Sequence, residues 1–395
     1  MRWRRVAGRR WHNARGMRAL SLLPCLVVLA GLAISPAPVS AQDESGRRAK
    51  EAYEHAVELD SRGNHAAALS LLWEAAGLAP RDADIQNRLG EALEHIGAFD
   101  AAVDAYRAAL AARPAFTKAS NNLILTLVKS GKGAEAVARA RALVAEAPDD
   151  PERYFTLGLA QSEQDVDGAL QSLQHALTLA PRHVLARYNL ALVLRRADRV
   201  PDAIAEFRRA LAIERRPEIQ YALGVTYWHQ GDLDGAVEAL RAAIETRADY
   251  ADAHYTLGAV LKAKNDVSGA AASLRRAIVL QPDLPAAHYL LGLVLQSMHD
   301  EGGAHAELAE AQRLRARAAS EQEAIVWTAV GTEKLNDGDA AGAVACFTRA
   351  TTSLDAYAPA HYQLGRALLR LGRRDAARAA FARAHQLNPS LVAPM

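Results

Sequence analysis

The chain has 395 residues, of which half are hydrophobic and only 6% are aromatic. Its formal net charge of +2 hides an uneven distribution, because residues 1–41 contain seven arginines and no acid. The rest of the chain therefore holds 40 Lys and Arg against 45 Asp and Glu. A protein that neutralises nucleic-acid phosphates needs a basic stripe. The body of this chain, at about −5, does not supply one, so no nucleic-acid partner is expected.

The N-terminus is organised like a secretory signal peptide. A basic region precedes an apolar stretch of 16 residues (19–34), and small residues follow up to Ala41. We expect cleavage between Ala41 and Gln42, which makes residues 1–41 a signal peptide of an exported, periplasmic or secreted protein. The alternative is an uncleaved membrane anchor, although 16 residues are fewer than the ~20 that span a bilayer. Translation from Met17 would give a leader of 25 residues.

Cysteine usage is sparse. One of the two cysteines, Cys25, lies in the predicted leader, so the mature chain keeps a single thiol, Cys346. An internal disulfide is therefore impossible, and we interpret Cys346 as a small buried packing residue.

Residues 49–391 repeat a unit of about 34 residues. The phrase AHYTLG at 253–258 returns as AHYLLG at 287–292 and as AHYQLG at 360–365. Taking the last residue of the phrase as position 8 gives ten units, at residues 49–82, 83–116, 117–150, 151–183, 184–216, 217–250, 251–284, 285–318, 324–357 and 358–391.

Small residues recur at fixed places in each unit. Position 8 is Gly in seven units, an Ala stands eleven or twelve residues later in all ten, and a second Ala follows in all but one. Each unit has two apolar runs at helical spacing around a turn that is often marked by Gly. Helices that cross at ~8–10 Å leave room only for small side chains at the crossing. The pattern therefore predicts two packed helices in every unit.

This pattern resembles the tetratricopeptide repeat (TPR) family over residues 49–391. The resemblance implies an all-α fold in which about ten helix-turn-helix repeats stack into a right-handed superhelix with a concave and a convex surface. Residues 42–48 are expected to form a short N-terminal segment, unit 1 to cap the array, and residues 392–395 to form a C-terminal tail. The leader and the repeats together indicate an exported bacterial protein.

The repeat loses its register once. Residues 319–323, ASEQE, are five more than the unit requires. Because Ser320 and Glu323 have the spacing of a capping box, we expect an extended second helix in unit 8 and a new helix from Ser320. Units 1–8 then occupy residues 49–318, and units 9 and 10 occupy residues 324–391.

No motif indicates catalysis. The chain has no phosphate-binding glycine loop, no His-Glu-x-x-His sequence, no paired-cysteine metal site and no Gly-x-Ser-x-Gly elbow. His254, His288 and His361 recur at position 4 with the period of the repeat, so we interpret them as packing residues. We therefore expect no enzyme, no metal, no cofactor and no small-molecule substrate.

Five consecutive units carry an aromatic residue at position 5, which in TPR proteins is one of the first-helix positions that line the concave groove. They are Phe155, Tyr188, Tyr221, Tyr255 and Tyr289, and Leu192 and Val225 stand beside them at position 9. With first helices ~8–10 Å apart, these rings span roughly 32–40 Å, which matches an extended peptide of ~10–12 residues. Tyrosine is also common here in the family, where it packs on the next unit. We therefore interpret the rings mainly as packing residues and keep ligand contact as a hypothesis.

The same face of units 2 and 3 is polar. Asn87, Arg88, Lys118, Asn121 and Asn122 can hydrogen-bond a peptide backbone or a carboxylate. This set slightly resembles carboxylate-clamp TPR domains, but the Asn at position 9 and the Lys at position 5 of that clamp are missing. We do not transfer the clamp's specificity.

Together these features predict a non-catalytic scaffold that binds other proteins or extended peptides, in cell-envelope assembly. The alternative is a membrane-tethered accessory subunit of an envelope complex whose leader is not cleaved.

Overall fold

The structure is a computed structural model that describes residues 41–389 and residue 391. Within these residues it contains nineteen α-helices and no strand, which confirms the all-α prediction. The helices are α1 Ala41–Ser61, α2 His65–Leu78, α3 Ala83–His95, α4 Phe99–Ala112, α5 Thr117–Lys129, α6 Gly133–Glu146, α7 Pro151–Gln161, α8 Val166–Leu179, α9 Val184–Arg196, α10 Val200–Ile213, α11 Pro217–Gln230, α12 Leu233–Thr246, α13 Ala251–Ala263, α14 Val267–Leu280, α15 Pro285–Ser297, α16 Glu301–Asn336, α17 Ala340–Ser353, α18 Ala358–Arg370 and α19 Arg374–Leu387.

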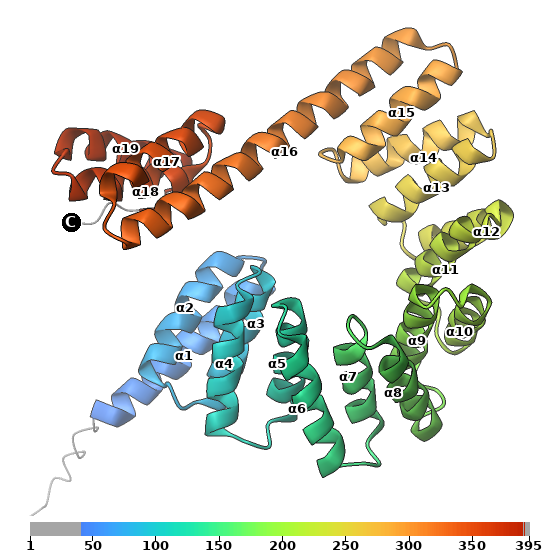
Figure 1. The fold of residues 1–395 in the computed structure, drawn as a ribbon, viewed down its shortest axis with the longest axis horizontal. Coiled ribbons are helices and arrows are strands. Elements are labelled where there is room, and N and C mark those ends of the chain that lie inside the picture. The colour runs from blue at the N-terminus through green and yellow to red at the C-terminus, as the bar shows by residue number, and fades with distance from the viewer. Residues whose placement is uncertain (1–40, 390, 392–395) are drawn as a thin grey trace, which may run out of the picture.

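Consecutive helices form the pairs that the repeat predicts. Units 1–7 correspond to α1–α2 through α13–α14, unit 8 to α15 and the first part of α16, unit 9 to the rest of α16 with α17, and unit 10 to α18–α19. Figure 1 shows the pairs following one another around an open arc, with α16 (orange) leading away to α17–α19 (red). In units 1–7 and 9 the second helix also packs against the first helix of the next unit. The pairs therefore stack as a repeat array.

Small residues lie where the two helices of a unit cross. A Cβ atom on Gly258 would lie 2.6 Å from Cγ of Leu274, and one on Gly90 would lie 2.5 Å from Cε1 of Tyr106. Glycine is thus required where a large side chain of the second helix reaches across. The Ala that follows position 8 is at most 2% exposed in all ten units: Ala68, Ala102, Ala136, Ala169, Ala203, Ala236, Ala270, Ala304, Ala343 and Ala377.

The turn inside a unit combines a left-handed residue with a helix cap. The backbone has positive φ at Gly63, Gly97, Gly131, Gly231, Gly338 and Gly372, and also at Asp198, Asn265 and His299. Glycine adopts this conformation at little cost, so the sequence marked six of these nine left-handed turns. The tenth turn, residues 162–165 of unit 4, has no residue with positive φ. In five units an N-cap Asp accepts a hydrogen bond from a Gly amide three residues later, at Asp165, Asp232, Asp266, Asp300 and Asp339.

The described chain begins inside a helix. Because α1 starts at Ala41, residues 42–48 belong to its first two turns, which corrects the prediction of a separate segment. The hydroxyl of Ser45 donates to the carbonyl of Leu78 at 3.0 Å and ties this part of α1 to the end of α2. The predicted signal peptide lies, apart from Ala41, outside the described residues, and cleavage before Gln42 stays a prediction. Among the described helices, none is both long enough and apolar enough to cross a membrane.

One continuous helix, α16, joins units 8 and 9. Its 36 residues make it about 54 Å long, and Ser320 lies in its interior. The expected extension of the unit 8 helix is confirmed, but the expected new helix start at Ser320 is wrong. Residues 304–330 contain neither Gly nor Pro, so nothing breaks the helix and no chain reversal occurs. Residues 315–323 are exposed except for Ser320.

As a result, unit 9 does not stack on unit 8. No buried apolar cluster in the described chain contains residues from both sides of the exposed stretch 315–323. We call units 1–8 the first stack and units 9 and 10 the second stack.

Position 10 of each unit marks where a stack begins. It is Ala, Thr or Val in the eight units that pack on a preceding unit, at Ala92, Thr126, Ala160, Val193, Thr226, Val260, Val294 and Ala367. In units 1 and 9 the position holds Glu58 and Glu333, both exposed. A carboxylate is stable at position 10 only where no preceding unit covers it, because burial of an unpaired charge is costly.

The residue after the buried Ala marks where a stack ends. It is apolar in the eight units that the next unit covers, at Leu69, Val103, Val137, Leu170, Ile204, Val237, Ala271 and Val344. In units 8 and 10 it is His305 and Arg378, both exposed. We call the side of a unit that carries this residue its closing face. Polar outer faces on terminal repeats keep repeat arrays soluble, and here they bound two stacks.

Candidate protein-binding surface

The first helices of successive units form one continuous face. Helix α3 approaches α5, α5 approaches α7, α11 approaches α13, and α13 approaches α15. Side chains also bridge neighbouring first helices, since Arg196 of α9 donates to the carbonyls of Ser162 and Glu163 after α7, at 2.9 Å each. Residues at positions 5 and 9 of different units therefore lie on a shared surface, which we call the first-helix face.

The five aromatic residues predicted for the groove all lie on this face. Phe155, Tyr188, Tyr221 and Tyr255 are half-buried against the core of units 4–8, while Tyr289 is 41% exposed. The two apolar neighbours at position 9, Leu192 and Val225, are also half-buried. The stripe therefore offers ring edges and partly covered apolar surface rather than free rings.

Four of these five rings contact another aromatic ring or a guanidinium group. Phe155 lies 4.9 Å from the ring of His183 and Tyr221 lies 5.2 Å from Tyr250, both between ring centroids. Tyr188 packs on Phe207 at 6.0 Å, and the guanidinium of Arg315 lies 4.8 Å from the centroid of Tyr289. Burial raises the pKa of Tyr188 above its usual value of 10.0. These contacts support the packing interpretation of the rings.

The polar residues predicted in units 2 and 3 gather around a carboxylate, Glu91. Its two oxygens accept hydrogen bonds from Asn87 at 2.9 Å, Arg88 at 2.9 Å and Asn122 at 3.3 Å. The ammonium group of Lys118 lies 2.7 Å from one of these oxygens. Arg88 also pairs with Asp60 at 2.6 Å, so two carboxylates balance the two cations. Neither cation is left unpaired for a ligand carboxylate.

Asn121 differs from the other four polar residues. Its carbonyl oxygen Oδ1 is buried and has no hydrogen-bond partner in the described chain. Because this oxygen is buried, it is not exposed to a bound segment, and an unpaired buried acceptor carries a desolvation cost. At this end the first-helix face therefore offers a neutralised ion network.

Burial alone would raise the pKa of Glu91, but hydrogen bonds from Lys118, Arg88 and Asn87 outweigh it and lower the pKa below 4.5. Glu91 is the central residue that sequence reasoning missed. The signal was present, because an acid at position 9 of unit 2 is followed by a base at position 2 of unit 3. Such a pair meets only when the units stack.

The recurrent histidines at position 4 hold the loop between units. The Nε2 atoms of His254, His288 and His361 lie 3.2, 2.9 and 2.9 Å from backbone carbonyls six residues earlier. Gln86 and Arg187 make the same i−6 contact at position 4 of their units. The histidines thus act in the scaffold, and the phrase AHY is mainly a structural signature.

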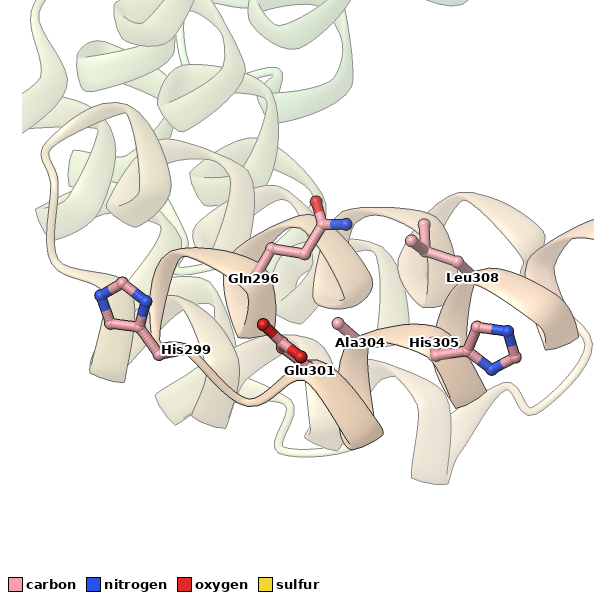
Figure 2. Close-up of a pocket in the computed structure, with 6 residues that line it drawn as sticks. All are labelled: Gln296, His299, Glu301, Ala304, His305 and Leu308. Carbon is pink, nitrogen blue, oxygen red and sulfur yellow. The ribbon is translucent and has the colours of Figure 1, made fainter.

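A shallow hollow of about 360 Å³ lies on the closing face of unit 8, between α15 and α16. Figure 2 shows His299 and His305 at opposite ends of it, with Gln296 and Glu301 between them. In the described part of the chain, no group of three or more His, Cys, Asp or Glu side chains is arranged to hold a metal ion. The hollow therefore offers separated polar groups and no converging site.

Comparison with known families identifies the repeat. Models described as tetratricopeptide repeat match residues 53–115, 96–161, 160–218, 212–253, 221–285 and 358–391. Together these matches cover more than half of the chain. The chain belongs to the tetratricopeptide repeat family. Residues 286–357, which contain the continuous helix α16, lie between the two matched stretches.

Individual relatives match parts of the array. Cellulose synthase operon protein C of Salmonella typhimurium is 32% identical over 164 residues, which are 39% of this chain and only 14% of that protein. The TPR protein TTC0263 of Thermus thermophilus is 28% identical, with a TM-score of 0.41, over 45% of this chain and 98% of that one. A TPR protein of Parabacteroides merdae is 18% identical, with a TM-score of 0.49, over 63% of this chain and all of that one.

Family membership fixes the general class of function. The TPR array is a protein-interaction scaffold, because its stacked helices provide an extended surface for other chains.

Proposed function

We propose that this protein is a non-catalytic scaffold that binds an extended segment of a partner protein along the first-helix face of units 4–8. The observation that carries the proposal is the run of five aromatic residues at one repeat position, half-buried or exposed on a single face. An aromatic ring that is already held by packing loses little side-chain entropy on binding. Tyrosine adds a hydroxyl group for hydrogen bonds.

The predicted leader supports export of the protein from the cytoplasm. We therefore propose that it acts in the cell envelope. The name of the Salmonella relative, from a cellulose synthase operon, is consistent with that setting. The alternative is a membrane-tethered accessory subunit of an envelope complex with an uncleaved leader. N-terminal sequencing of the exported protein separates the two, because a chain that starts at Gln42 has lost the anchor.

Site-specific photo-cross-linking in the host tests the binding face. A photoreactive phenylalanine analogue replaces Tyr255 of the first-helix face, or Val279 on the second helix of the same unit. Val279 is 67% exposed, so this control is accessible but lies on the other helix. We expect a discrete cross-linked partner from position 255 and none from 279. The reverse result would contradict the proposed face.

A variant then measures how much the rings contribute. Tyr188→Ala, Tyr221→Ala and Tyr255→Ala together should weaken the captured partner by about 2–4 kcal/mol if one or two of them are hot spots. Circular dichroism should show unchanged helicity, because the small residues at the helix crossings are untouched. Equal affinity of the variant and the native chain would mean that the rings are only structural.

A further inference from the structure

The closing face of unit 10 has the same place in the repeat as the hollow on unit 8, but its chemistry differs. On unit 8 the hollow is lined by Gln296, His299, Glu301, Ala304, His305 and Leu308. The matching positions of unit 10 are Leu369, Gly372, Arg374, Ala377, Arg378 and Phe381. Two arginines thus replace an acid and a histidine.

Unit 10 is the most basic part of the array. Residues 358–391 contain six arginines and a single acid, Asp375. Two of the arginines are engaged, since Arg370 donates to the carbonyl of Leu335 and Arg383 pairs with Asp355. The remaining four are available for a partner.

Two of the four remaining arginines, Arg374 and Arg378, lie at positions that match the hollow of unit 8. Arg373 and Arg374 have no ion pair in the described chain. Arg378 lies 3.7 Å from Asp375, with both side chains more than 80% exposed, and such pairs contribute little. Arg366 stands at position 9, on the first-helix face, where it donates to Gln363 at 3.0 Å. Exposed guanidinium groups favour carboxylates, which they bind in a bidentate manner.

The shape of this face suits a helix. In every unit that is followed by a stacked unit, a first helix lies over the closing face, as α18 does over α17. On unit 10 no described element does so, and Leu369, which matches Gln296 of the hollow, is 39% exposed. A partner helix that lies there can bury Leu369 while its acids meet the arginines.

We propose that the closing face of unit 10 binds an α-helical segment of a partner protein that carries Asp and Glu beside an apolar stripe. The arginines are few and flank apolar surface, which fits an amphipathic helix better than the many phosphate contacts of a nucleic acid. This site is distinct from the first-helix face, so the helix-binding proposal and the proposed function can be tested independently.

The test uses the protein produced from the whole reading frame and a synthetic probe. The probe is an amphipathic helical peptide with leucines on one face and glutamates beside them, and its control is a scrambled peptide of equal composition. Fluorescence anisotropy measures both at low and high salt. We expect the helical probe to bind at least tenfold more tightly than the scrambled one, and more weakly as salt rises.

Paired charge reversals locate the site. Arg374→Glu with Arg378→Glu should weaken the helical probe at least tenfold, and the same two positions changed to Lys should weaken it less. Arg275→Glu with Arg276→Glu, exposed on α14, makes the same change of net charge and should alter affinity less than twofold. The Tyr188, Tyr221 and Tyr255 variant should bind as the native chain does, which separates this site from the groove.

Several results would overturn the proposal. They are undetectable binding of the helical probe, equal binding of the scrambled peptide, and equal losses from the unit 10 and α14 variants. Tighter binding of a DNA duplex or of anionic lipid vesicles than of the helical probe would assign the face to another class of partner.

Discussion

The first stack and the second stack are built from the same repeat, but each has its own beginning and end. Both open with an exposed glutamate at position 10, Glu58 or Glu333, and both close with a polar residue after the buried Ala, His305 or Arg378. A single array with a local insertion would have kept apolar residues on both sides of the insertion. The five extra residues therefore lie at a boundary between two stacks, and α16 crosses it as one continuous helix.

The stacks also differ in charge. Residues 49–318 hold 36 acids and 30 bases, whereas residues 324–391 hold 5 acids and 8 bases. A protein whose two stacks have opposite net charge favours different partners at its two ends. The two proposed partners differ accordingly, because the first stack is proposed to bind an extended segment and the second an acidic helix.

The largest expected effect separates the folding of the two stacks. Phe347 is fully buried in the second stack and lies over Gly331, so Phe347→Ala should cost about 3–5 kcal/mol. Two units are fewer than the roughly three that a stable array needs. We expect α17–α19 to unfold while the first stack remains folded. Hydrogen exchange with mass spectrometry should show loss of protection only in these helices.

Phe207→Ala is the matched change in the first stack, where the side chain is equally buried. Its cost should be similar, but neighbours on both sides support the unit, so protection should fall around α9–α11 and persist elsewhere. If Phe347→Ala instead raised exchange equally in both stacks, the chain would be one cooperative unit and the comparison would fail.

Short-range signals made most of this fold predictable. The glycines and alanines at helix crossings and the six turn glycines act within one unit, so the sequence shows them directly. The turns at Asp198, Asn265 and His299 were hidden, because non-glycine residues rarely adopt positive φ.

The errors arose where a local signal competed with its surroundings. Ser320 and Glu323 have capping-box spacing, yet no Gly or Pro in residues 304–330 ends the preceding helix, and helix propagation prevails. The candidate binding face was only partly predictable. The aromatic stripe follows from the repeat, whereas the network around Glu91 depends on contacts between different units.

A smaller effect tests the closing faces. Val237→His places an imidazole where the next unit covers it, and burial of an unpaired polar group should cost about 1–3 kcal/mol. The reverse change, His305→Val, lies on the uncovered face of unit 8 and should change stability by no more than about 0.5 kcal/mol. Urea unfolding of both variants measures the difference. Equal losses would show that unit 8 is covered in solution and that the boundary between the stacks is not real.

The smallest effect concerns pH and the half-buried ion network around Glu91 in the first stack. The folded-state pKa of Glu91 is lowered, so its contribution to stability is present above the ordinary value of 4.5 and is lost as the pH falls through the lower folded value. Glu91→Gln should therefore be less stable than the native chain at pH 7, and this gap should narrow below about pH 4.5. Asp375→Asn in the second stack, where the carboxylate is 98% exposed, should show no such gap at either pH. Urea unfolding at pH 7 and pH 3.5 measures the stability of both variants and of the native chain. If the stability difference between Glu91→Gln and the native chain were the same at both pH values, the network would hold units 2 and 3 together by packing rather than by charge.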